Sequence, residues 1–456
     1  MSRNATKDLT TGSPMKLILG FGIPLLFGML FQQFYNMMDT IIVGKFLGVS
    51  ALASVGATGS INFMIIGFCM GVCNGFAIPV AQRFGAKDEH GMRKFVANSV
   101  WLSIIFAVVM AVLVCVFCRQ ILELMNTPED IIDGSYSYIF VIFLGIPATY
   151  MYNLLSGIMR SLGDSKTPLY LLIFSSILNI ILDLLSIIVL KMGVAGAAWA
   201  TVIAQAVSGF CCLGVIWKKF PILHVQREEW QPDKLCILNL CNMGIPMGLQ
   251  YSITAIGSVI IQAAVNSLGS VAVASVAAAV KINMFLCCPY DAMGSTMATY
   301  AGQNVGAGKF DRLKQGEKSC TLLGLVYGIA AFIFILLFGK YLALLFVDVS
   351  EEVIINQAHL FLMCNSAFYF PLALVNIFRF TIQGMGFSRL AILAGVCEMI
   401  GRTVVAFVFV PISDIRQFVL PVRWHGYWRI VSLYQLSFSV CAVWKSGRHW
   451  KIDRRY

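Results

Sequence analysis

Long apolar runs, separated by short polar segments, repeat along the whole chain. Most of these runs are at least as long as the helix of about 20 residues that crosses a bilayer. We therefore predict eleven membrane-spanning helices and a poorer twelfth after them, over residues 15–43, 51–81, 95–118, 134–158, 167–190, 193–217, 236–266, 271–304, 319–346, 353–381 and 389–411. Because the runs continue through the chain, a single signal peptide ahead of a globular body is excluded.

The composition supports this interpretation. Of the 456 residues, 59% are hydrophobic and only 12% are charged, whereas a soluble protein carries about 25% charged residues. A water-facing shell cannot be built from so few charged side chains. The predicted fold class is therefore an all-α protein that passes through the lipid bilayer many times.

The net charge of +11 reflects where the basic residues lie. If the N-terminus is placed in the cytoplasm, the cytoplasmic segments carry most Lys and Arg residues, with four each in 83–94, 218–234 and 309–318, and Arg160 and Lys166 between two spans. The opposite loops carry one each, at Lys45, Arg119, Lys191 and Lys340. This positive-inside bias predicts a cytoplasmic N-terminus. A basic stripe with interleaved aromatic residues is absent, so no nucleic-acid partner is expected.

The sequence contains no recognisable catalytic or metal-binding motif. The fourteen cysteines include close pairs such as Cys115 and Cys118, but these lack histidine partners at ligand spacing, so packing is their expected role. A P-loop, a GxSxG motif and an HExxH motif are all absent. We therefore expect that the protein binds no cofactor and is not an enzyme. An integral-membrane enzyme is the disfavoured alternative to a transporter.

An internal repeat divides the chain into two halves. Residues 47–55 (LGVSALASV) resemble residues 268–276 (LGSVAVASV), and Gln82 corresponds to Gln303. We predict an N-lobe over 1–217, a cytoplasmic linker over 218–235, a C-lobe over 236–411 and an atypical tail over 412–456. With six spans in each half, the halves share one orientation, and two such bundles around a cleft are typical of secondary transporters.

Four acidic residues lie well inside predicted spans, at Asp39, Asp183, Asp291 and Glu398. Each costs about 2.5–3.5 kcal/mol at a helix centre, so each needs a partner or a purpose. Gln32, Asn36 and Asp39 share one helical face, as do Asn179 and Asp183. Two carboxylates accompanied by carboxamides can hold a proton or a sodium ion. Local hydrogen bonding or helix capping is the alternative role for both.

The other two acids are less informative. Glu398 and Arg402 are four residues apart, which is the spacing of an intrahelical ion pair, and this structural reading is favoured over a coupling role. For Asp291 the sequence leaves a gating contact and a cavity-facing carboxylate equally open. Tyr35 and Tyr136, with Gln32 and Asn36, are candidates to line a substrate cavity for aromatic cations.

Several motifs resemble those of the multidrug and toxic compound extrusion (MATE) transporters, in particular the DinF-like bacterial branch. They are Gln33–Thr40 (QFYNMMDT), Gln82–Lys87 (QRFGAK), Met159–Pro168 (MRSLGDSKTP), Leu178–Asp183 (LNIILD) and Gly193–Thr201 (GVAGAAWAT). In order and spacing the resemblance covers about residues 15 to 410. It implies twelve helices in two six-helix lobes around a V-shaped cavity, in the inner membrane of a bacterial cell.

The same resemblance implies a function and a site. Cationic or amphipathic small molecules would be exported in exchange for protons or sodium, by a chain expected to act as a monomer. The family's N-lobe network maps onto Asp39, Asn153, Asn179, Asp183 and Thr201, with Tyr138 or Tyr136 as its tyrosine. A flippase for lipid-linked precursors is the alternative within the same superfamily, but it needs a cationic cavity, and the N-lobe spans carry acids.

The resemblance ends at about residue 410. Arg416, Arg423, His425 and Arg429 stand where an apolar twelfth helix is expected, and only 430–444 is apolar. Fifteen helical residues cover about 22 Å, which is short of the roughly 30 Å hydrocarbon core. We therefore hypothesise that this tail is out of frame relative to the family or is an altered terminus, which the other two reading frames of the coding DNA would test.

Overall fold

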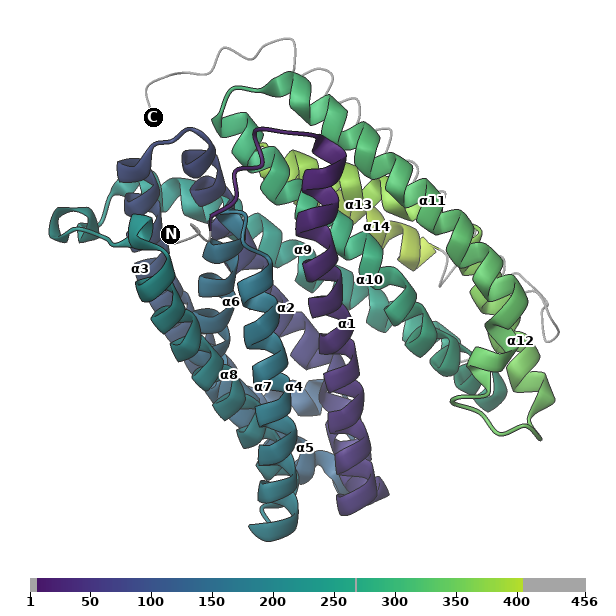
Figure 1. Ribbon diagram of the computed structural model, residues 1–456. Coiled ribbons are helices and arrows are strands. Elements are labelled where there is room, and N and C mark those ends of the chain that lie inside the picture. Colours follow the sequence, from purple (N-terminus) through teal and green to yellow (C-terminus); the bar gives the residue numbers. More distant parts are fainter. Residues whose placement is uncertain (1–5, 267–268, 405–456) are drawn as a thin grey trace.

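The protein is built from helices packed into two groups (Figure 1). This computed structural model describes residues 6–266 and 269–404, and no strand occurs among them. The first group comprises α1 (Pro14–Leu47), α2 (Val49–Gly85), α3 (Glu89–Val116), α4 (Cys118–Leu124), α5 (Glu129–Leu144), α6 (Ile146–Ser161), α7 (Lys166–Leu184), the π-helix η1 (Leu185–Val189) and α8 (Gly193–Lys219). The second comprises α9 (Lys234–Asn266), α10 (Ser270–Gly306), α11 (Phe310–Ala343), α12 (Glu352–Ser366), α13 (Tyr369–Gly384) and α14 (Arg389–Val404).

The helix lengths agree with a multi-pass membrane protein. Within the described residues, eight helices are long and apolar enough to cross a bilayer, and two bent pairs raise the number to ten. The pairs α5–α6 and α12–α13 bend by 47° and 49°, and each second helix carries a proline near its start, Pro147 and Pro371. The sixteen residues of α14 fall in the predicted eleventh span. The predicted twelfth helix and the tail over 412–456 lie outside the described residues.

The two lobes meet closely at one end and diverge toward the other (Figure 1). Gly71 and Gly75 of α2 face Gly248 and Gly244 of α9, where an added Cβ would collide with the facing backbone. Small residues of this kind allow helices in a membrane to approach closely. The two lobes are therefore in direct contact where α2 and α9 cross.

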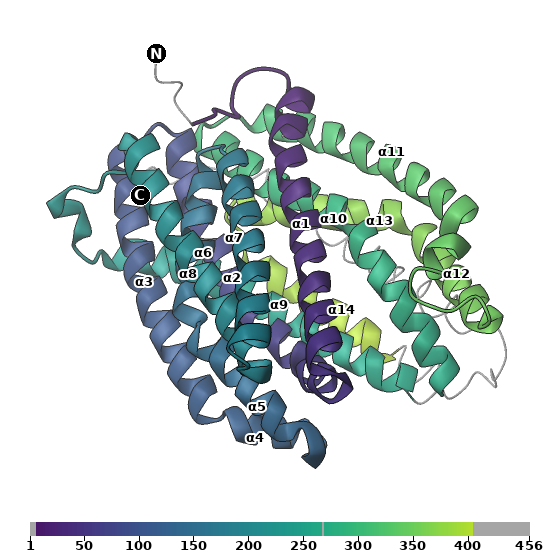
Figure 2. The same cartoon turned by 60° about the horizontal axis from the view of Figure 1, so that its bottom comes forward.

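Helix α1 packs against both lobes. Its first half places Ile18, Phe21 and Leu25 in the hydrophobic core of the second lobe. Its second half brings Tyr35 to Thr201 of α8, in the first lobe. Figure 2 shows α1 lying between the two groups of helices. The helix is continuous through Pro24, although that proline removes one backbone hydrogen-bond donor. A movement of α1 would therefore change its packing in both lobes.

The linker between the lobes is attached to the first lobe. It contains two short 3₁₀ turns, η2 (Pro221–Leu223) and η3 (Arg227–Trp230). Glu229 is 1% exposed and accepts hydrogen bonds from Arg93 Nε at 2.9 Å and from the Gln226 backbone N–H at 2.8 Å. Its carboxylate also lies 2.9 Å from His90 Nδ1. Burial raises the pKa of Glu229, but the bonds from Gln226 and Arg93 outweigh burial and hold that pKa below its usual value.

We expect Glu229→Gln to lower the apparent unfolding temperature in detergent, by an amount that corresponds to about 1.5 kcal/mol at neutral pH. Because the pKa of Glu229 is lower in the folded protein, its stabilisation is present above the unfolded pKa of about 4.3 and is lost as the pH falls through the folded value. The difference between wild type and variant should therefore close below about pH 4. A difference that does not shrink as the pH falls further below that value would contradict this assignment.

Candidate functional site

Two carboxyl groups meet inside the first lobe, although their residues are far apart in sequence. Asp39 lies near the end of α1, and Asp183 lies near the end of α7, directly before the π-helix η1. The two carboxyl groups are within hydrogen-bonding reach of one another. Single π-turns of this kind often accompany functional sites.

The two carboxyl groups have few polar partners apart from each other. Asp183 is fully buried, and apart from Asp39 neither of its oxygens has a hydrogen-bond partner among the described residues. The same is true of Asp39 Oδ1 and of Asn179 Oδ1. Carboxyl oxygens that lie together away from water need a proton or a cation between them, because two unpaired negative charges there are strongly unfavourable. The geometry can therefore hold a proton or a small cation.

A shell of polar side chains surrounds the pair. Asn179 Nδ2 donates to Thr201 Oγ1 of α8 at 3.2 Å, and the Tyr35 hydroxyl lies 3.2 Å from the same oxygen. The Tyr138 hydroxyl of α5 lies within electrostatic range of both carboxyl groups. Four helices thus contribute to one cluster that contains Asp39, Asp183, Asn179, Thr201, Tyr35 and Tyr138, which we call the acidic cluster.

Asn153 lies beside this cluster without bonding to its carboxyl groups. Its Nδ2 donates to the Thr149 carbonyl at 2.8 Å, while Thr149 Oγ1 donates to Gln205 Oε1 at 2.6 Å. Gln205 was not predicted from the sequence. Its spacing of four residues from Thr201 would have placed it on the same face of α8.

Two predicted cavity residues are elsewhere in the structure. Asn36 is exposed and does not line the cavity, because successive residues of a helix point about 100° apart and Tyr35 is the one that faces Thr201. Tyr136 stacks on Phe140 at 5.5 Å between ring centroids. Tyr138, two residues along, points nearly the opposite way and is buried within electrostatic range of the two carboxyl groups. Neither Asn36 nor Tyr136 lines the cavity described below, and their role in substrate binding stays a prediction.

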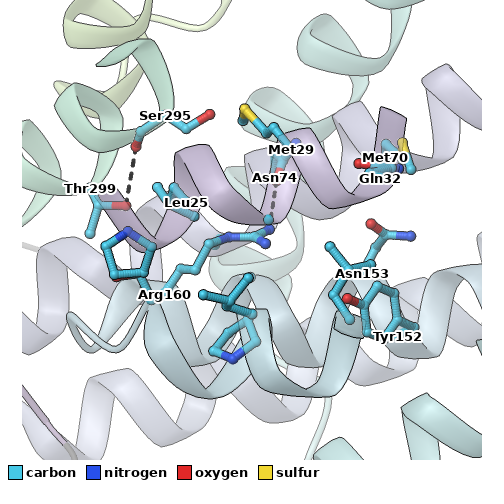
Figure 3. Close-up of a pocket in the computed structure, with 18 of the residues that line it drawn as sticks. Leu25, Met29, Gln32, Met70, Asn74, Tyr152, Asn153, Arg160, Ser295 and Thr299 are labelled. Carbon is cyan, nitrogen blue, oxygen red and sulfur yellow. Dashed lines mark hydrogen bonds between the residues drawn. The ribbon is translucent and has the colours of Figure 1, made fainter. Parts of the chain in front are cut away.

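A cavity of about 290 Å³ lies between the lobes and reaches the acidic cluster. Its walls include Gln32 and Tyr35 of α1, Asn153 of α6, and Asn179 and Thr201. The second lobe contributes Tyr251, Ser295 and Thr299. Figure 3 shows Arg160 of α6 among the lining residues, with its guanidinium directed to Asn74. Arg160, which the sequence pattern placed between two spans, is the second-last residue of α6.

The predicted acids of the second lobe lie in other surroundings. Asp291 is exposed, and Asn376 Nδ2 donates to its Oδ1 at 3.3 Å. Arg379 Nη2 in turn donates to Asn376 Oδ1 at 2.7 Å. Arg402 Nη2 and Glu398 Oε1 are 2.7 Å apart, so the intrahelical ion pair that their spacing predicts is present. No residue of the first lobe bonds to Asp291 within the part of the chain that the structure describes.

Comparison with known proteins decides the family. The sequence profile of the MatE family matches the chain twice, over residues 24–185 and 246–408, once in each half. The chain belongs to the MATE family. Members of this family are transporters, so the chain is a multi-pass membrane transporter and not an enzyme. The double match agrees with the internal repeat.

Other MATE proteins resemble the chain over most of its length. It is 30% identical to the "Probable multidrug resistance protein YoeA" of Bacillus subtilis, over 80% of both chains. It is 28% identical to the "Probable multidrug resistance protein YpnP" of the same organism, over 83% of both chains. A solved structure titled an outward-facing conformation of a multidrug resistance MATE family transporter has a TM-score of 0.89 at 22% identity, and the match covers 96% of this chain and 98% of that one. The predicted two-lobed fold is confirmed.

Proposed function

We propose that this protein exports cationic or amphipathic small molecules in exchange for protons or sodium ions. The observation that carries the proposal is the contact between Asp39 and Asp183, because it joins a buried acid of α7 to α1, a helix that packs in both lobes. A bound proton or sodium ion would stabilise this contact. Loss of the ion would leave two charges that repel each other and would favour a different position of α1.

Such an exchange also requires contacts that close one end of the transporter, and two hydrogen bonds between the lobes provide them. Gln82 Nε2 of α2 donates to the Gly384 carbonyl of α13 at 3.0 Å, and Gln303 Nε2 of α10 donates to the Ser161 carbonyl of α6 at 2.8 Å. Gln82 and Gln303 are equivalent positions of the repeat, so the two bonds are related by its symmetry. We propose that they hold the cytoplasmic end shut in this outward-open state. Movement of α1 would be the step that releases them.

The energy available from an ion gradient is sufficient for export. One proton that moves through about 100 mV releases about 2.3 kcal/mol. A difference of one pH unit adds about 1.4 kcal/mol. Together they support roughly 500-fold accumulation at tight coupling, since each 1.4 kcal/mol corresponds to a factor of ten. Substrate must bind one state of the transporter better than the other for this energy to be used.

The wild-type protein in liposomes tests the proposal. A fluorescent cation such as ethidium would be loaded, and its movement followed while the pH gradient and the sodium gradient are imposed separately. We expect uphill transport that collapses when one of the two gradients is removed. Transport that is insensitive to both gradients would refute the exchange mechanism. Protease access to the two termini of protein in oriented vesicles would test the proposed cytoplasmic N-terminus.

A flippase for lipid-linked precursors remains the second candidate, since Arg160 makes the cavity less acidic than the sequence implied. A pyrophosphate group carries several negative charges and calls for a cluster of cations around it. Arg160 is the one Lys or Arg that lines the cavity within the described residues. The exporter of small molecules is therefore the better supported function.

A further inference from the structure

One guanidinium group lies in the central cavity with little to balance its charge. Arg160 Nη2 donates to Asn74 Oδ1 at 3.2 Å, and this is the only hydrogen bond of its side chain among the described residues. The ionisable side chains that act on it most strongly are Tyr152, Cys73, Tyr251 and Cys212, none of which is a carboxylic acid. It takes part in no ion pair within the described part of the chain.

The position of Arg160 at the end of α6 suggests a simpler role, because cations stabilise the C-terminal end of a helix. Its guanidinium, however, reaches Asn74 on α2 and lines the cavity (Figure 3). Four of its five N–H donors are left for other partners. An arginine inside a membrane is costly and generally marks a substrate or ion pathway.

Side chains of the second lobe add to this end of the cavity. Tyr251 of α9 lies within electrostatic range of both Arg160 and Arg379, and close to the Asn74 amide. Ser295 and Thr299 of α10 contribute hydroxyl groups to the same wall (Figure 3). These groups include hydrogen-bond donors from both lobes, as an anionic oxygen group requires.

Toward its other end the same cavity approaches the acidic cluster, although Asp39 and Asp183 are not among its lining residues. There it is lined by Tyr35, Asn179 and Thr201 of the acidic cluster. Asn153 also lines it, seven residues before Arg160 on α6, which corresponds to about 10 Å along the helix axis. A molecule with a cationic end and an anionic end could therefore lie along the cavity with each end beside the opposite charge.

We propose that Arg160, Asn74 and Tyr251 form an anion subsite that binds the carboxylate of an exported amphiphile whose cationic part faces the acidic cluster. The guanidinium fork matches a carboxylate in a two-bonded geometry. The inference rests on the proposed export function and narrows its substrates to a class that includes zwitterions with an aromatic body. It assigns Arg160 to substrate binding and not to topology.

A matched pair of dyes tests the subsite. Rhodamine B carries a cationic xanthene and a carboxylate, and its ethyl ester carries the cation alone. Equilibrium binding to the purified full-length protein would be followed by fluorescence, at a mildly alkaline pH where the carboxyl group is ionised. We expect Arg160→Gln to weaken the binding of rhodamine B about tenfold. The affinity for the ester should change less than about twofold, because the ester has no charge for Arg160 to bind.

Controls separate this result from misfolding. Arg160→Lys keeps the charge without the fork, so it should weaken rhodamine B binding less than Arg160→Gln does. Arg119→Gln removes an exposed arginine in α4 and should leave both affinities unchanged. The subsite is refuted if Arg160→Gln weakens both dyes equally, if it leaves rhodamine B binding intact, or if wild type binds only the ester. Gradient-driven transport of the ester in liposomes tests the export function separately, since its failure would leave the binding difference unaffected.

Discussion

Asp39→Asn is expected to abolish ion-driven export and to leave the fold intact. Asparagine has nearly the shape of a protonated aspartic acid, so the contact with Asp183 can form without a coupled ion. The variant should then no longer change state when the ion gradient is applied. In liposomes, substrate accumulation should fall from a ratio of up to roughly 500 to near unity, because the gradient no longer biases the two states. Asp183→Asn should have the same effect.

The matched control is Asp133→Asn, which removes an exposed acid of α5 that lies 3.3 Å from Arg119. This variant should accumulate substrate as wild type does. A symmetric size-exclusion peak and an unfolding temperature close to that of the wild type show that Asp39→Asn is folded. Full ion-dependent accumulation by folded Asp39→Asn would remove this residue from the mechanism.

Alanine at Gly85 and Gly306 is expected to have the second largest effect, because these glycines cross at the closed end of the cleft. A Cβ at Gly85 would collide with the Gln303 carbonyl oxygen, and a Cβ at Gly306 with the Gln82 carbonyl oxygen. Overpacking of this kind costs about 1–3 kcal/mol at each position. If closure at this end belongs only to the proposed outward-open state, the population of that state should fall about 5- to 150-fold for each substitution.

Two measurements check this expectation. Transport by Gly85→Ala and by Gly306→Ala should fall in proportion to the population of the outward-open state. The distance between spin labels at Asn126 and Ser350, which are exposed on loops of the two lobes, should shorten as the open side closes. Gly214→Ala is the matched control, because a Cβ there meets no atom within 4 Å. Unchanged label distances and transport in all three variants would show that the crossing does not control the state.

Much of the fold could be predicted because a membrane restricts the choices. Backbone polar groups in lipid must bond within a helix, so apolar runs of sufficient length give the spans directly. The repeat gave the two lobes, and the cost of a buried charge singled out Asp39 and Asp183. That these two acids contact each other was only a hypothesis, since they lie on helices separated by more than a hundred residues.

What the sequence by itself determined was the set of helices, their division into two related halves, and the residues too polar for lipid. These properties depend on composition and on spacing within single segments. The tertiary structure alone decided that Tyr138 is buried within electrostatic range of the acids, that Arg160 lines the cavity, and that Gln82 and Gln303 bond across the lobes. Each of these depends on the rotation of one helix against another, which is set by side-chain packing between distant segments and leaves no periodic trace in the sequence.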